Sequence, residues 1–204
     1  RKAYCEKFEL PYQAITNKIE DFRAKRITSY LNLLQELAGK KFKQIKDSTM
    51  ETSQEIKTYF NMLPDSSVLK QKFIELISQN TTWNEIRNWA DQHISMGSID
   101  VNKLDKANYK EGEQLPNQFN DAHAALRGFA QSNLESSVIL SAGMNPRLYS
   151  YIENFDDFYP DQKGYIKKKI VIKVSDYRSA LIQGKFLAKK GLWVSEYRIE
   201  SGLN

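Results

Sequence analysis

Six basic residues near the carboxyl end of the chain have the types and spacing best suited to binding chemistry. Lysines at alternate positions of a strand project from one face, and basic residues seven and four positions apart share one face of a helix. The six are Lys167, Lys169, Lys173, Arg178, Lys185 and Lys189, with the aromatic residues Tyr165 and Trp193 beside them. Such a surface attracts phosphates through counterion release, and exposed rings stack on unpaired bases. We therefore predict that these eight residues form a nucleic-acid-binding face.

The same basic segment has a second interpretation, in which the charges are neutralised within the protein. Residues 163–198 carry ten Lys or Arg against two acids, whereas residues 47–162 carry seventeen acids against nine Lys or Arg. Lysines also protect edge strands against aggregation, and aromatic side chains commonly fill cores. The binding face therefore requires that the cations point outward and are not paired with carboxylates of the central stretch.

Residues that would indicate an enzyme are sparse. The two histidines, His93 and His123, have no partner at a metal-ligand spacing, and the single cysteine, Cys5, cannot form an internal disulfide. Neither a G-x-G-x-x-G nor a G-x4-G-K-[ST] phosphate loop occurs in the sequence. We expect no catalytic residue, no metal and no cofactor.

Two acidic groups leave an enzymatic alternative open. Asp156, Asp157 and Asp161 precede a lysine-bearing strand, an order that metal-dependent nucleases also use, because paired carboxylates hold Mg²⁺ against a phosphate. The acid expected two positions before Lys173 is replaced by Val171, however. Glu196, Arg198 and Glu200 alternate on the last strand, as in an acid and base pair or a surface ladder. An unrecognised enzyme would need a pocket that gathers Asp156, Asp161, Glu196 or His123.

The first half of the chain is expected to be helical. Apolar residues recur at intervals of three or four over 11–46, 53–63 and 68–79, which predicts three helices. A fourth helix, over 82–96, starts at Thr82 and Glu85, whose spacing is that of a capping box, and ends at Gly97. We expect these four helices to form an antiparallel bundle.

The end of the chain has the period of a strand. Ile166, Ile170, Ile172 and Val174 alternate with Lys167, Lys169, Val171 and Lys173. Asp176 is expected to cap a helix that Gly191 stops, and residues 192–199 are predicted to form a second strand. Because two strands make a marginal sheet, a further strand or a partner chain must complete it, and residues 99–101 are a candidate.

The predicted fold class is α+β, predominantly α, with an N-terminal antiparallel helical bundle and a small C-terminal strand-helix-strand unit. Residues 1–97 form the bundle, residues 98–116 are a connection without a sustained period, and residues 117–204 hold a helix and the basic segment. The three parts can also form one continuous domain. The helix capped by Asn117 is extended in this prediction through Val138 to Gly143.

A chain of 204 residues with net charge +5 is long enough to bury a core, and no apolar run approaches the length of a membrane span. We expect a soluble, noncatalytic binding protein that docks nucleic acid or another anionic partner. The alternative is a protein interaction module, of the effector or adaptor type, that uses the N-terminal bundle. A cytoplasmic or other intracellular location is expected, and the missing initiator Met indicates that the N-terminus is trimmed or that the chain is cut from something larger.

Overall fold

The computed structural model describes residues 1–46, 54–93, 98–101, 105–140 and 143–200. Contacts divide the chain into two compact units, one of residues 1–35 and 97–204 and the other of residues 36–96. This grouping places the first 35 residues with the carboxyl half of the chain. The predicted fold class, α+β with a predominance of helix, is confirmed. Within the described ranges, no helix is both long and apolar enough to cross a membrane.

The unit of residues 36–96 contains three short helices around an aromatic core. They are α3 (Gln54–Asn61), α4 (Val68–Ser78) and α5 (Trp83–His93), close to the predicted ranges. The capping box is confirmed, because the Thr82 amide donates to Glu85 Oε2 (3.1 Å) and the Glu85 amide donates to Thr82 Oγ1 (3.4 Å). Phe60 and Phe73 stack with their ring centroids 4.5 Å apart. The predicted helix ends at Ser53, Met96 and Gly97 lie outside the described residues.

The long amino-terminal helix is shorter than predicted. Helix α2 spans Phe22–Lys46 and follows the short helix α1 (Lys2–Lys7), so the predicted start at residue 11 is wrong. Asp21 has a φ of 54°, in the left-handed region, and a residue in that conformation cannot continue a right-handed helix. The apolar spacing before Phe22 therefore belongs to a loop, which Arg26 holds by donating to the Ile15 carbonyl (2.8 Å).

A four-stranded parallel sheet lies in the larger unit. Its strands are β1 (Ser98–Val101), β4 (Ser137–Leu140), β5 (Lys169–Val174) and β6 (Val194–Ile199), in the order β1-β4-β5-β6. The predicted strands at the carboxyl end and at residues 99–101 are confirmed. The predicted helix through Val138 is wrong, because this segment is β4, between β1 and β5. Val138, Ile139 and Leu140 are all buried, so this inner strand shows no alternation of apolar and polar residues.

Three helices cover one face of the sheet. They are α6 (Asp121–Ala130), α7 (Pro146–Tyr151) and α8 (Tyr177–Ala188). Short 3-10 turns at Asn117–Phe119, Ile152–Asn154 and Asp156–Phe158 and a small hairpin, β2 (Tyr109–Lys110) with β3 (Glu113–Gln114), complete the connections. The core contains Leu126, Phe129, Tyr149 and Leu187 from these helices and Val138, Ile170, Ile172 and Val174 from the sheet. Right-handed crossovers that step along the sheet in one direction place their helices on one face.

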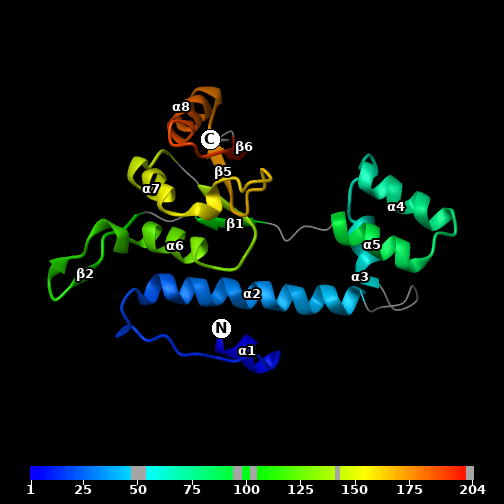
Figure 1. Ribbon diagram of the computed structural model, residues 1–204, viewed down its shortest axis with the longest axis horizontal. Helices are drawn as coiled ribbons and strands as arrows, with labels where there is room; N and C mark the ends of the chain where they lie inside the picture. Colours follow the sequence, from blue (N-terminus) through cyan, green and yellow to red (C-terminus); the bar gives the residue numbers. More distant parts are fainter. Residues whose placement is uncertain (47–53, 94–97, 102–104, 141–142, 201–204) are drawn as a thin grey trace. The chain divides into compact units, whose positions relative to one another are not determined.

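Helix α2 packs against α6 at a very short distance, and the two run side by side in Figure 1. Thr28 donates its hydroxyl to the Gly128 carbonyl (2.9 Å). A Cβ at Gly128 would lie 2.7 Å from Ile27 Cβ and 2.8 Å from the Ala24 carbonyl oxygen. Gly128 therefore sets the separation of the two helices.

Replacing Gly128 with alanine is expected to destabilise the protein by roughly 1–3 kcal/mol, because backbone must move to admit the methyl group. Helix propensity alone predicts the opposite sign, a gain of about 1 kcal/mol. Gly39→Ala in the same α2 helix is the matched control, since no atom lies within 4 Å of the added Cβ, and it should stabilise. Urea unfolding of both variants distinguishes the two effects, and equal stabilisation would contradict the close helix contact.

Candidate functional site

Two of the six predicted cations are ion-paired. Lys167 Nζ lies 3.0 Å from an Asp157 carboxylate oxygen, and Lys173 Nζ lies 2.9 Å from a Glu200 carboxylate oxygen. Asp157 belongs to the acidic central stretch, so at this position internal neutralisation occurs. These two lysines are therefore weaker candidates for phosphate contacts than the other four.

The other four cations are exposed and lie on two different sides of the sheet. Lys169 opens β5, and its side chain shares the face of Lys173, away from the helices. Arg178, Lys185 and Lys189 are exposed along α8, whose inner side packs on the opposite face. Among the described residues, these four side chains have no carboxylate within ion-pair distance. The structure therefore brings three cations together on α8 and separates Lys169 from them.

Asp176 determines where α8 begins. Its carboxylate accepts a hydrogen bond from the Ser179 amide (2.7 Å), as the sequence predicted for a capping residue. This bond and one from the Ser175 hydroxyl hold the pKa of Asp176 below its ordinary value. Positions 178, 185 and 189 then follow at helical spacing on the solvent side. We call the exposed side chains of Arg178, Lys185 and Lys189 the α8 ridge.

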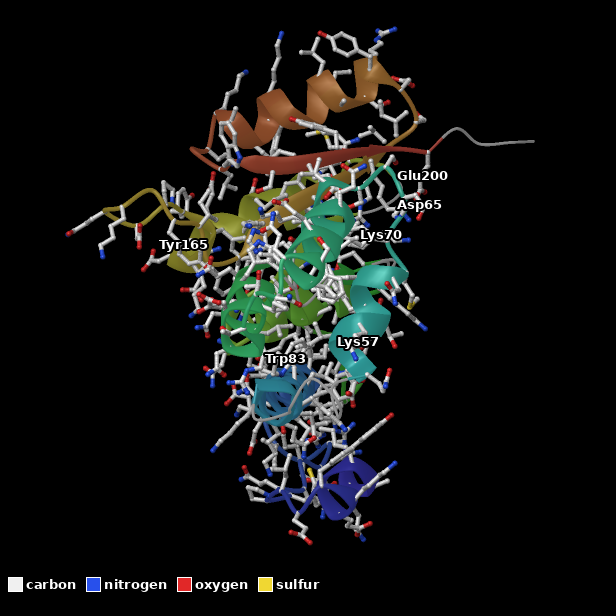
Figure 2. All side chains as sticks on the ribbon, turned by 90° about the vertical axis from the view of Figure 1, so that its right-hand side faces the viewer. Lys57, Asp65, Lys70, Trp83, Tyr165 and Glu200 are labelled. Carbon is white, nitrogen blue, oxygen red and sulfur yellow. The ribbon has the colours of Figure 1, made fainter. Side chains whose placement is uncertain are left out.

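The two predicted aromatic residues lie at the end of the sheet where strands β5 and β6 begin. Tyr165 precedes β5 and Trp193 precedes β6, and these strands are parallel neighbours. Figure 2 shows Tyr165 at the opposite end of this sheet from Glu200, which follows β6. Tyr165 donates its hydroxyl to Glu135 (3.0 Å), which raises the pKa of Tyr165. Trp193 is 65% exposed and is the better placed of the two rings to accept a base.

Sequence reasoning missed Lys168, which is completely buried between the half-buried Lys167 and the exposed Lys169. Its Nζ donates to the carbonyls of Ser132 (2.6 Å), Phe129 (2.8 Å) and Leu134 (3.3 Å) at the end of α6. Burial lowers the pKa of Lys168 to about 8, although Asp157 opposes this effect. The strand period could have found it, because Lys168 has the same parity as Ile170, which is buried in the core.

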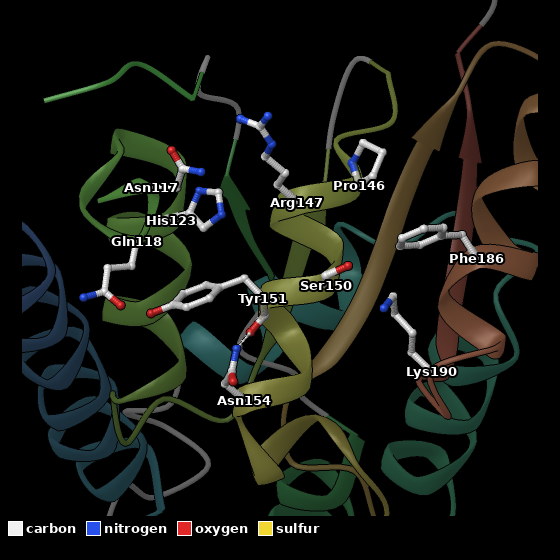
Figure 3. A pocket seen from close by; sticks show the side chains of 10 residues that line it. All are labelled: Asn117, Gln118, His123, Pro146, Arg147, Ser150, Tyr151, Asn154, Phe186 and Lys190. Atoms are coloured by element: carbon white, nitrogen blue, oxygen red, sulfur yellow. Dashed lines mark hydrogen bonds between the residues drawn. The ribbon is translucent and has the colours of Figure 1, made fainter. Parts of the chain in front are cut away.

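A pocket of about 700 Å³ surrounds α7 in the helical layer. Figure 3 shows His123 and Tyr151 on one side of α7, and Phe186 and Lys190 of the α8 segment on the other. The lining residues are Asn117, Gln118, His123, Pro146, Arg147, Ser150, Tyr151, Asn154, Phe186 and Lys190. Lys190 is already paired with Glu153 (2.6 Å), which leaves Arg147 as the exposed cation at the rim.

His123 is the one buried histidine of this pocket. Its Nδ1 lies 3.0 Å from Asp105 Oδ1 and 2.9 Å from Oδ2, so the carboxylate fixes the ring orientation. The ring also packs against Tyr151, with centroids 5.1 Å apart. Such a pair can orient a base for a nucleophile. Throughout the described ranges, however, no hydroxyl or thiol is hydrogen-bonded to His123.

The acids on which an enzymatic alternative rested do not come together. Asp156 lies in a 3-10 turn, Asp161 accepts the Lys163 and Tyr165 amides in a tight turn, and Glu196 accepts from Arg198. Of the four residues named for such a pocket, His123 alone lines the cavity around α7. In the part of the chain that the structure describes, no three His, Cys, Asp or Glu side chains are grouped to hold a metal ion.

A buried arginine ties the helical layer to the amino-terminal segment. Arg127 Nε and Nη2 donate to the two oxygens of Asp21 (2.7 and 2.5 Å), and Nη1 donates to Tyr151 Oη (3.0 Å). Burial alone lowers the pKa of Arg127, but the hydrogen bonds to Asp21 and Tyr151 outweigh it and raise that pKa. The network holds one wall of the pocket in place.

Comparisons of the chain with protein-family models, with curated proteins and with solved structures found no match. The features that bear on function are the geometry and charge of the α8 ridge, the aromatic residues next to it and the pocket around α7.

Proposed function

We propose that this chain is a noncatalytic binding protein that docks nucleic acid through the α8 ridge. The observation that carries the proposal is the exposure of Arg178, Lys185 and Lys189 along one helix, with no carboxylate of the described residues paired to them. Neutralising phosphates with such side chains releases condensed counterions, which is the main source of affinity for nucleic acids. A ridge on one rigid helix also presents its charges at fixed spacing.

Aromatic residues at the two ends of α8 support a nucleic acid over a simple anion. Tyr177, at the first position of the helix, is 76% exposed, and Trp193 follows the helix in the turn before β6. Exposed rings beside cations stack on unpaired bases, with about 1–3 kcal/mol per base. We therefore favour single strands, or segments with unpaired bases, as the preferred form.

The alternative function, a protein interaction module that uses residues 11–96, has weaker support from the exposed apolar side chains. The exposed large apolar residues described there include Met62, Val68 and Ile74, and those described between residues 165 and 199 include Leu181, Ile182 and Trp193. A docking groove of the effector or adaptor type needs a contiguous apolar patch. The carboxyl segment combines apolar exposure with positive charge, and it is the better candidate surface.

Replacing Arg178, Lys185 and Lys189 together with glutamate is expected to weaken nucleic-acid binding at least tenfold. Each phosphate contact contributes about one unit to the slope of log affinity against log salt concentration, so the slope should fall by about 2–3 units. Fluorescence anisotropy at two or more salt concentrations, with single- and double-stranded DNA and RNA, measures both quantities. Arg178, Lys185 and Lys189 are exposed, so the fold should be unaffected.

A matched control separates the ridge from net charge. Lys18, Lys41 and Lys110 are also exposed, and their replacement with glutamate changes the net charge by the same amount. This control should keep most of the affinity and most of the salt slope. Equal losses in the two triple variants, or binding that is insensitive to salt in the unmodified protein, would refute the proposed docking face.

A further inference from the structure

Among the strands that the structure describes, β6 is an edge of the sheet. It is last in the strand order, and all of its residues are partly or fully exposed, in contrast to the largely buried β5. The Glu200 amide donates to the Val174 carbonyl of β5 (2.9 Å). Because backbone groups of successive residues point to opposite edges of a strand, Tyr197 and Ile199 direct their N–H and C=O groups to the outer edge. Unpaired edges of this kind pair readily with another strand.

The sequence of β6 is complementary to itself. Glu196 and Arg198, which are ion-paired with one another within the chain, lie on either side of Tyr197; because Tyr197 points to α8, they share the sheet face that points away from the helices. In an antiparallel pair centred on Tyr197, Glu196 of each chain lies directly opposite Arg198 of the other. Opposite charges at directly opposed positions stabilise such a pair, and like charges destabilise it. Tyr197 of the two chains would form the central hydrogen-bonded pair.

The flank of α8 next to this edge is apolar. Gly184 lies over β6, since a Cβ there would collide with the Tyr197 hydroxyl. Leu181 and Ala188 are exposed and lie three and four positions from Gly184, so they share its side of the helix. Gln183, which accepts a hydrogen bond from the hydroxyl of Tyr149 in α7, points the other way. The α8 ridge lies between these two sides and faces solvent.

We propose that β6 pairs antiparallel with β6 of a second copy of this chain, about a two-fold axis at Tyr197. The sheet then continues across both copies, and the apolar flanks of the two α8 helices meet above the paired strands. Two-fold symmetry doubles each Glu196 to Arg198 contact, as expected for an isologous interface. The α8 ridges remain exposed and lie on one side of the dimer. This inference does not depend on nucleic-acid binding.

Sedimentation velocity of the full chain over a range of concentrations tests the proposal. The unmodified protein should sediment as a dimer of the 23.7 kDa chain and dissociate on dilution. Glu196→Arg and Arg198→Glu each place like charges opposite one another twice, and each should weaken the dimer roughly 10- to 100-fold. Mixing the two single variants should restore dimers, because only in the heterodimer do the two arginines of one variant face the two glutamates of the other.

Two controls keep the result interpretable. Glu113→Arg in the β2–β3 hairpin reverses an exposed charge elsewhere and should leave the dimer unchanged. Hydrogen exchange of the unmodified chain at two concentrations should show slower exchange of residues 195–199 at the higher one, even if a variant fails to fold. A monomer at every concentration, a dimer that both single variants retain unchanged, or exchange in β6 that is independent of concentration would each overturn the proposal.

Discussion

Asp21→Asn is expected to lower the free energy of unfolding by roughly 3 kcal/mol, because it leaves the guanidinium of Arg127 buried without its counter-charge. Arg127 is 7% exposed and makes both of its carboxylate contacts to Asp21. Asparagine keeps the shape of the side chain and tolerates the positive φ of this position. The loss of stability therefore measures the removal of the Asp21 charge and not strain in the backbone. Chemical denaturation measures it.

The coupling between the two residues provides the control. Removing both charges, with Asp21→Asn and Arg127→Met together, should cost less than the sum of the single changes, because no buried charge remains unpaired. Glu20→Ala, at the exposed neighbouring position, should change stability by less than about 0.5 kcal/mol. Additive losses in the double variant would show that the bidentate contact contributes nothing to the fold.

Lys168→Met is expected to destabilise the protein by roughly 2 kcal/mol near neutral pH, because methionine retains the apolar stem but removes the donor. The carbonyls of Ser132 and Leu134 then lose the hydrogen bonds from Lys168, whereas the Phe129 carbonyl keeps those from the Ser132 amide and hydroxyl. Each buried acceptor left unpaired costs about 1–3 kcal/mol, and the relief of a desolvated charge offsets part of this loss. The exposed neighbour Lys169→Met is the matched control and should have little effect.

The difference in stability between the unmodified protein and Lys168→Met is expected to depend on pH. The pKa of Lys168 is about 8 in the folded protein and 10.5 in the unfolded chain, so between these values the unfolded state binds more protons. The stability of the unmodified protein relative to Lys168→Met should then rise with pH across this window, by about 1–3 kcal/mol. Comparing the two proteins at each pH cancels other titrating groups. A difference that stays constant or shrinks from pH 8 to 10.5 would show that Lys168 does not titrate in this range.

The arrangement of the predicted basic residues could be only partly predicted from the sequence. The helical spacing of Arg178, Lys185 and Lys189 follows from local geometry, and these three residues do share an exposed side of α8. The pairing of Lys167 with Asp157 and of Lys173 with Glu200 depends on how distant segments meet. Strand parity placed Lys169 on one face of the sheet, but only the position of α8 on the other face separates it from the ridge.

The sequence by itself determined the features that depend on residues a few positions apart. The cap at Asp176, the capping box at Thr82 and the strand-helix-strand order at the carboxyl end are of this kind, because a side chain and the nearest backbone amides satisfy one another. The parity that turns Lys168 inward was also present in the sequence.

Only the tertiary structure decided the features that depend on contacts across long stretches of chain. Strand β4 has no periodic signal because it is buried between two neighbours, and its apolar run fits a helix equally well by sequence. Arg127 and Asp21 are 106 positions apart, and nothing in either local sequence indicates the pair. The free-energy cost of burying the Arg127 charge is offset by Asp21, which only the folded chain brings within hydrogen-bonding distance.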